Sequence, residues 1–166
     1  RISKFPKKLL KILLQELAKR LLQKEKILYF LLSDGTGFGY DELYPLKILR
    51  GTEVKKIKSH IRVVPVVGVT LSGKRIVMTA ESGGAYASEV KLLLKDLNEI
   101  DPALILQAEC FIADKCYDCI EVMERLMELG VKPAIKVKET FRQKVRHPLR
   151  KISKEFWEEW GRKRCL

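Results

Sequence analysis

The sequence has few of the residues that bind soft metals or form disulfide frameworks. Its 166 residues include two histidines and four cysteines. Cys116 and Cys119 form a C-x-x-C pair, but a structural zinc site needs four ligands. Cys165 lies far along the chain, and His60 and His147 have no paired spacing. Because no secretion signal precedes the cysteines, we interpret them as ordinary thiols of a reducing compartment.

Long apolar runs are also missing. The leucine-rich segment 9–22 is interrupted by charged and polar residues, and no signal-peptide cleavage pattern follows it. These absences exclude a bilayer-spanning segment and predict an intracellular, cytoplasmic protein with no membrane partner. With 46% hydrophobic and 33% charged residues, the composition is typical of a folded domain with a real core.

Acidic residues are the scarcer charged type, and the basic excess lies at the two ends. Residues 1–26 carry nine Lys/Arg against two acids, and residues 138–166 carry ten against four. The centre, 27–137, carries fourteen against fifteen. Basic flanks around a neutral centre are typical of arms that contact a polyanion, because neutralised phosphates release counterions. Solvated surface lysines are the alternative interpretation.

Apolar periodicity predicts a mixed α/β fold in three parts. These are a basic amphipathic helical arm (1–26), a core (27–137) and an incomplete basic, aromatic helical segment (138–166). We expect helices at 7–24, 86–99, 118–129 and 153–160, and strands at 27–33, 61–71, 74–81, 103–113 and 131–137. The glycine-rich stretch 35–60 indicates a loop or weak hairpin. Together these elements predict a mixed five-stranded sheet with helices on both faces.

The first predicted helix has one leucine face. Leucines recur along it at three- and four-residue spacings, at Leu10, Leu13, Leu14, Leu17 and Leu21. We expect this face to pack on the core. The opposite, basic face is compatible with contact to DNA, a partner helix or an anionic membrane surface.

Two aspartates, Asp34 and Asp114, each follow an apolar strand directly. If those strands are neighbours, the carboxylates converge and repel each other unless a cation lies between them. Oxygen ligands without histidine favour Mg²⁺ or Mn²⁺, the ions of phosphodiester chemistry. The alternative is that each aspartate is an ordinary turn residue.

Three blocks resemble the DDE insertion-sequence transposases. LLSDGTGFGY at 31–40 is similar to their first-aspartate motif, a hydrophobic strand ending in Asp followed by small residues. FIADKCYDCIEVMERLMELGVKPAI at 111–135 resembles the second-aspartate block, with Cys116 where the family usually has Gly. The block 53–94 looks like the Lys-rich entry, hairpin and helix between them. The resemblance covers roughly residues 27–164 and implies a ribonuclease H-like fold.

The resemblance also implies an activity: metal-dependent DNA cleavage and strand transfer during transposition. It makes Asp34 and Asp114 the catalytic carboxylates that bind Mg²⁺ (or Mn²⁺), with Lys115, Tyr117 and Asp118 shaping the site. The expected DNA partners are the ends of the mobile element and the target DNA. Whether the protein forms a homodimer is left undecided by the sequence. We expect phosphate or nucleic-acid contacts from Lys55, Lys56, Lys58, Lys115, Arg142, Lys144, Arg146 and Arg150.

The third acid of the family is not found in its expected pattern. In the family it is a Glu on a helix after the fifth strand, a few positions after an aromatic and a basic residue. The segment that begins at Trp160 resembles the residues that precede this Glu. Glu155, Glu158 and Glu159 are nearby substitutes outside that pattern. A truncated or inactive copy is therefore expected.

Other functions remain as alternatives. A non-catalytic basic module would bind DNA or RNA through residues 1–26 and 138–166. A structure-specific nuclease would use the same fold on another substrate. A dinucleotide loop at Gly35, Gly37 and Gly39 is disfavoured, since the G-x-G-x-x-G spacing and a following helix are missing.

Overall fold

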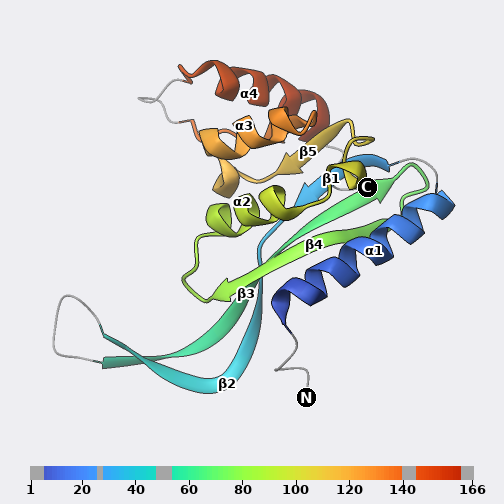
Figure 1. Ribbon diagram of the computed structural model, residues 1–166. Helices are drawn as coiled ribbons and strands as arrows, with labels where there is room; N and C mark the ends of the chain where they lie inside the picture. Colours follow the sequence, from blue (N-terminus) through green and yellow to red (C-terminus); the bar gives the residue numbers. More distant parts are fainter. Residues whose placement is uncertain (1–5, 26–27, 48–53, 140–144, 162–166) are drawn as a thin grey trace.

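The computed structural model describes residues 6–25, 28–47, 54–139 and 145–161, with the backbone alone for 40–47 and 54–59. Along the chain one helix is followed by four strands, and helices and strands then alternate through the second half (Figure 1). They are α1 (Lys7–Glu25), β1 (Leu28–Ser33), β2 (Thr36–Lys47), β3 (Val54–Thr70), β4 (Arg75–Gly84), α2 (Glu89–Glu99), the short 3-10 helix η2 (Pro102–Leu104), β5 (Cys110–Ala113), the short 3-10 helix η3 (Lys115–Tyr117), α3 (Ile120–Glu128), β6 (Lys132–Ile135) and α4 (Pro148–Trp160).

The described strands form one mixed, six-stranded sheet. Across its main body the order is β4, β3, β1, β5, β6. The pairs β4–β3 and β3–β1 are antiparallel, whereas β1–β5 and β5–β6 are parallel. The predicted mixed α/β sheet is thus confirmed, with six strands in place of five.

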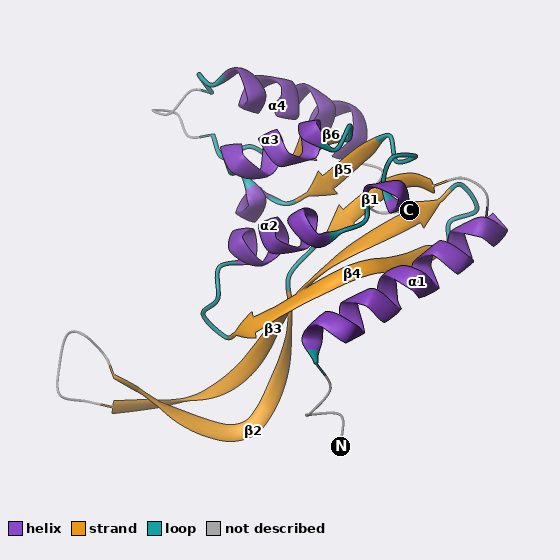
Figure 2. Cartoon of the chain, in the orientation of Figure 1, coloured by secondary structure: helices purple, strands orange, loops and turns teal. Residues whose placement is uncertain are grey.

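The sixth strand, β2, lies in the stretch expected to be a loop or weak hairpin. It pairs with the first half of β3 and forms a long antiparallel ribbon that extends away from the rest of the sheet (Figure 2). Among the described strands β2 pairs only with β3, so it is an edge strand, where Pro45 is tolerated. The pairing confirms the hairpin alternative for this stretch, which the glycines and Pro45 had left open beside a loop.

Other boundaries differ from the prediction for local reasons. The expected strand at 103–113 shrinks to β5, because Asp101 accepts a hydrogen bond from the Ala103 N–H (2.9 Å) and starts the η2 turn instead. Helix α4 begins earlier than residue 153, at Pro148, a residue favoured in the first turn of a helix. The predicted hairpin between β3 and β4 is confirmed, with Gly73 at φ 80° in its turn.

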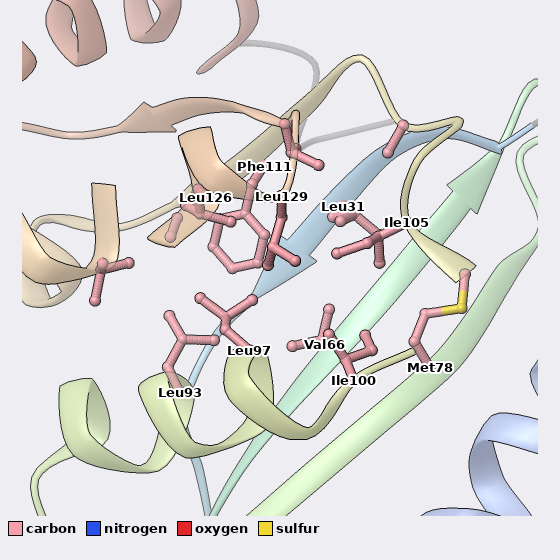
Figure 3. Close-up of a cluster of buried hydrophobic side chains, with 14 of the residues drawn as sticks. Leu31, Val66, Met78, Leu93, Leu97, Ile100, Ile105, Phe111, Leu126 and Leu129 are labelled. Carbon is pink, nitrogen blue, oxygen red and sulfur yellow. The ribbon is translucent and has the colours of Figure 1, made fainter. Parts of the chain in front are cut away.

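The helices cover both faces of the sheet. On one face, side chains of β1, β3, β4 and β5 pack with those of α1, α2 and α3 (Figure 3). On the other face, Phe30 and Ile112 pack with the aromatic end of α4, including Trp160. Helix α4 also closes the β6 edge, because the Ser153 hydroxyl bonds the N–H and the C=O of Ile135, both at 3.1 Å. None of the described helices is long and apolar enough to cross a membrane.

Helix α1 does not pack through its leucine face, and this expectation was wrong. The stripe that faces the sheet contains Lys11, Gln15, Ala18 and Leu22, offset by one residue from the leucine stripe. An offset of one residue turns a helix by about 100°. Six apolar residues of α1 are therefore exposed: Leu9, Leu10, Ile12, Leu13, Leu17 and Leu21.

A buried ionic cluster explains this orientation. The Lys11 ammonium lies 2.7 Å from Glu81, 2.9 Å from Asp96 and 2.6 Å from Glu99. Glu81 and Asp96 are buried, and Asp96 also accepts a hydrogen bond from Thr79 (3.0 Å). Two buried carboxylates without a cation would be strongly destabilising. Lys11 must therefore point inward, which turns the leucines outward.

The cluster should make stability depend on pH in a specific way. Burial raises the pKa of Asp96 from 3.8 to about 6. Between these values the folded protein keeps a proton that the unfolded chain has released, so the contribution of Asp96 falls as pH rises through this window. The contribution of Glu81 to stability changes with pH in the opposite direction. Burial opposes ionisation there, but hydrogen bonds from Lys11 and Lys95 lower its pKa from 4.5 to about 2, so its contribution is lost as pH falls below 4.5.

We expect Asp96→Asn to gain stability relative to the wild type as pH rises from about 4 to about 7, because the substitution removes the group with the raised pKa. Urea unfolding of both proteins across this range measures the difference. A difference that stays constant with pH would contradict the assigned direction of the Asp96 shift.

Candidate functional site

The structure brings Asp34 and Asp114 together at one end of two adjoining strands. Strands β1 and β5 run parallel, with Ser33 paired to Ala113, and each aspartate is the next residue. Neighbouring strands lie about 5 Å apart. Both aspartates line one pocket of about 220 Å³. Asp34 is exposed and Asp114 half-buried, so solvent reaches both carboxylates.

A break between β1 and β2 places Asp34 at this edge. Ser33 pairs with Val66 and Thr36 pairs with Val63, so one register continues along β3 through the break. In that register Asp34 lies opposite Pro65, which has no backbone N–H to donate. The break thus coincides with a position where the ladder is weakened.

Asp114 is held by the turn that follows β5. Its carboxylate accepts a hydrogen bond from the Lys115 N–H and caps the short helix η3. The Lys115 side chain lies at an exposed position beside it. A carboxylate fixed in this way keeps a second oxygen for another partner.

A third carboxylate, that of Glu89, lies against Gly35, the residue after Asp34, and it was not expected from the sequence. Glu89 starts α2, just after Ser88, which caps this helix. Its carboxylate fills the space above Gly35: a Cβ placed on Gly35 would come within 2.6 to 2.9 Å of its terminal atoms. Glu89 also pairs with Arg62 of β3 at 3.4 Å. An acid opening a helix after Ser82-Gly-Gly was the only available sequence signal.

Two buried hydroxyls lie under these carboxylates. Ser33 Oγ and the Tyr117 hydroxyl are buried, and neither makes a hydrogen bond of ordinary geometry within the described residues. Burial raises the pKa of Tyr117, and the negative charges of Glu89 and Asp34 add to this effect. Tyr117 therefore remains a neutral O–H donor beside the acids.

Asp118 belongs to the scaffold of the site. Arg150 of α4 binds it through two hydrogen bonds, 2.9 Å to Oδ1 and 2.6 Å to Oδ2. The Lys138 N–H donates a third, 2.8 Å to Oδ2. A bidentate pair of this kind fixes geometry as well as charge. It ties α4 and the segment after β6 to the turn that carries Asp114.

The basic residues expected to contact DNA differ in their exposure and in whether another side chain already binds them. Lys55, Lys56 and Lys58 lie on β3 in the extended ribbon, with side chains outside the described part. Lys115 and Arg146 are exposed, whereas the Arg150 guanidinium is engaged by Asp118. The remaining two, Arg142 and Lys144, lie outside the described residues.

The donor set suits a hard divalent cation. Asp34, Glu89 and Asp114 offer only carboxylate oxygens, the ligand type of Mg²⁺ and Mn²⁺. Within the described residues, no three His, Cys, Asp or Glu side chains are placed so that they could hold an ion as they stand. Asp34 and Asp114 line the same pocket, whereas Glu89 is not among the residues that line it.

Comparison with known proteins yields one informative relative. The chain is similar to an uncharacterized protein of Aquifex aeolicus (strain VF5), with 34% identity over 161 residues. The match covers 95% of this chain and 49% of that protein, so the chain spans about half the length of the relative. No family model matches the chain, and no solved structure matches it.

Proposed function

We propose that this chain carries the catalytic core of a DDE-type DNA transposase with a ribonuclease H-like fold. The observation that carries the proposal is the position of Asp34 and Asp114, which follow paired residues of two parallel strands and line one pocket. The order β4, β3, β1, β5, β6, antiparallel in its first half and parallel in its second, supports the fold assignment. The resemblance of residues 31–40 and 111–135 to the two aspartate motifs supports the family assignment.

In this proposal the carboxylates of Asp34 and Asp114 hold Mg²⁺ or Mn²⁺. An ion held there would supply activation of water or a 3′ hydroxyl and stabilisation of the leaving oxygen of the phosphodiester. Glu89 supplies the third carboxylate, on a helix before β5 and not in the later position that the family pattern implies. To take this role Glu89 would have to leave its pair with Arg62, which joins the two side chains at 3.4 Å. The Tyr117 and Ser33 hydroxyls, which make no hydrogen bond of ordinary geometry within the described residues, would be available to donate hydrogen bonds to these carboxylates.

The DNA is held by basic residues around this edge of the sheet. Lys115 is exposed directly beside Asp114, and β3 carries Lys55, Lys56 and Lys58 away from Asp34 along the ribbon. Both basic ends of the chain add charge, +7 and +6, and with the centre at −1 they give the net charge of +12. Phosphate neutralisation by these residues would make binding strongly dependent on salt.

The experiment that tests this function is a nicking and strand-transfer assay. Supercoiled and linear DNA are incubated with the chain and Mg²⁺, Mn²⁺ or a chelator. We expect cleavage that requires the metal and that Glu89→Gln reduces. Metal-independent cleavage would contradict the proposal. DNA binding that persists in chelator and in an Asp34→Ala/Asp114→Ala double variant, without cleavage by either protein, would favour the non-catalytic basic module.

A more specific expectation concerns Gly35. In Gly35→Ala the new methyl group would displace the Glu89 carboxylate, which is the far end of a flexible side chain. We therefore expect folding stability to change little but cleavage to fall about 10- to 100-fold, because a misplaced active-site group costs this much. Gly39→Ala is the matched control, since its Cβ would meet nothing within 4 Å. Equal activity in both variants would argue against a role for Glu89.

A further inference from the structure

The face of the sheet that carries α4 is covered over only part of its width. Helix α4 lies beside β5 and β6 (Figure 2), and its aromatic end packs with Phe30 of β1 and Val69 of β3. Strand residues alternate between the two faces, so every second residue of β3 before Val69 lies on this face as well. These residues are only half-buried, namely Val67, Pro65, Val63 and Ile61. Val77 of β4, paired with Val67, is 43% exposed. The sheet therefore has an open apolar area over β3 and β4, beside α4.

Asp34 lies on this open face of the sheet. Its place in the strand register is opposite Pro65, one of the half-buried residues of β3. Leu32, two residues earlier, packs with the apolar cluster under α4. Gly35, the next residue, faces α2 instead, because a Cβ there would meet the Glu89 carboxylate. The edge that carries Asp34 and the open apolar area are therefore continuous.

Phe38 lies on the same face, four residues beyond Asp34, and its side chain is 61% exposed. It pairs with Ile61 in the register that also places Asp34. Gly37 beside it faces the other way, since a Cβ there would come within 3.0 Å of the His60 ring, in the alternate stripe of β3. Four strand residues span about 13 Å. An aromatic ring is thus open to solvent about 13 Å from the candidate catalytic aspartate, on the same face.

A DNA strand bound at Asp34 has an open path across this part of the sheet. Toward β5 and β6 the face is filled by α4 and its aromatic side chains. Toward β3 and β2 lie the open apolar area and Phe38. A duplex presents charged phosphates to a protein surface, whereas an unpaired strand can present the faces of its bases, which stack on aromatic side chains. The open area therefore suits the bases of an unpaired strand better than the outside of a duplex.

We propose that Phe38 is a stacking platform for a base of an unpaired DNA strand, about two to four nucleotides from the phosphodiester at Asp34. This inference rests on the proposed function, because it takes DNA as the substrate. At 3.4 Å per stacked nucleotide, about 13 Å corresponds to about four nucleotides, and a stretched strand spans it with fewer. The substrate is accordingly DNA that is open, or easily opened, next to the cleaved bond.

The test compares the binding of a single strand with that of the duplex of the same sequence, in chelator so that no metal-dependent cleavage occurs. The single strand contains a fluorescent aminopurine base, whose emission falls when it stacks. The wild type should bind the single strand more tightly and quench its emission. Phe38→Ala and Phe38→Leu should each weaken this binding about 5- to 100-fold and abolish the quenching, because one base–aromatic stack contributes this much. Phe38→Trp should keep both.

Leu71→Ala is the matched control. Leu71 is a similarly exposed apolar residue (59%) that follows β3 directly, at the end of the strand away from Ile61. This variant should bind and quench as the wild type does, and circular dichroism verifies the fold of each protein. Unchanged binding and quenching in Phe38→Ala would overturn the proposal. Tighter binding of the duplex by the wild type would also overturn it, as would a change in Phe38→Ala that affects self-association and not DNA binding.

The nicking assay separates this proposal from the catalytic one. Metal-dependent cleavage by the wild type, with quenching that does not depend on Phe38, would leave the catalytic function standing and remove the stacking platform. Quenching that depends on Phe38, in a chain that cleaves DNA with none of the metals, would support the platform and contradict the catalytic function.

Discussion

Asp114→Asn is expected to lower metal-dependent DNA cleavage by more than about 100-fold, because loss of even an outer-shell partner of a metal ligand costs roughly 10- to 100-fold. Asp34→Asn should have an effect of the same size, since the two carboxylates line the same pocket. The double variant should be no worse than either single variant, because residues that act as a unit are not additive. Initial nicking rates at saturating Mn²⁺ measure these changes.

A matched control separates this effect from a general change of charge. Glu109→Gln removes a carboxylate at an exposed position just before β5, at the opposite end of the strand from Asp114. It should leave the nicking rate unchanged. Unfolding curves of Asp114→Asn should also show an intact fold, although the capping bond to Lys115 is weakened. Full activity in Asp114→Asn would remove that residue from the site.

Lys11→Met is expected to destabilise the fold by about 3–5 kcal/mol, the usual loss when one partner is removed from a buried ion pair. The methionine keeps most of the apolar stem but leaves Glu81 and Asp96 buried without their central cation. Helix α1 would also lose its main anchor to β4 and α2. Guanidinium-induced unfolding at neutral pH measures the change in the free energy of unfolding.

Two further variants test the explanation of this loss. Lys19→Met removes a lysine that pairs at the surface with Glu16 and Asp101, and it should cost far less. Combining Lys11→Met with Glu81→Gln and Asp96→Asn should recover part of the lost stability, because the buried groups are then neutral. A triple variant less stable than Lys11→Met alone would contradict an electrostatic origin.

Much of the fold followed from local apolar patterns. Strands β1 and β6, the turn between β3 and β4, and helices α2 and α3 were predicted within a few residues of their ends, because each has a clear period or a clear turn, whereas β5 begins seven residues later than expected. The β2–β3 ribbon was expected only as one of two alternatives, a loop or a weak hairpin, because Gly37, Gly39 and Pro45 are turn residues by composition. Only pairing with β3 makes that segment a strand, and pairing with a distant segment leaves little local signal.

The orientation of α1 shows a second case in which apolar periodicity does not predict the structure. Its leucines recur at three- and four-residue spacings, yet the buried stripe is shifted from them by one residue. The position of Lys11 depends on Glu81 and Asp96, 70 and 85 residues further along. A pattern within one helix reveals an apolar face but not whether the core or another molecule covers it.

The candidate site was predictable in part for the same reason. Asp34 and Asp114 each follow an apolar strand, and strand ends are where such sheets collect functional residues. Glu89 could not be assigned from the sequence, because its place against Gly35 depends on the path of two strands before α2. The absence of a side chain at Gly35 leaves room for the Glu89 carboxylate, and this is visible only in three dimensions.

The most direct test of a shared metal site is anomalous diffraction from crystals of the chain soaked in Mn²⁺. The account predicts a manganese peak between the carboxylates of Asp34 and Asp114, with Glu89 turned away from Arg62 toward it. The peak should disappear in Asp34→Asn crystals prepared in the same way. Manganese bound elsewhere, with none between these two carboxylates at saturating concentration, would contradict the account.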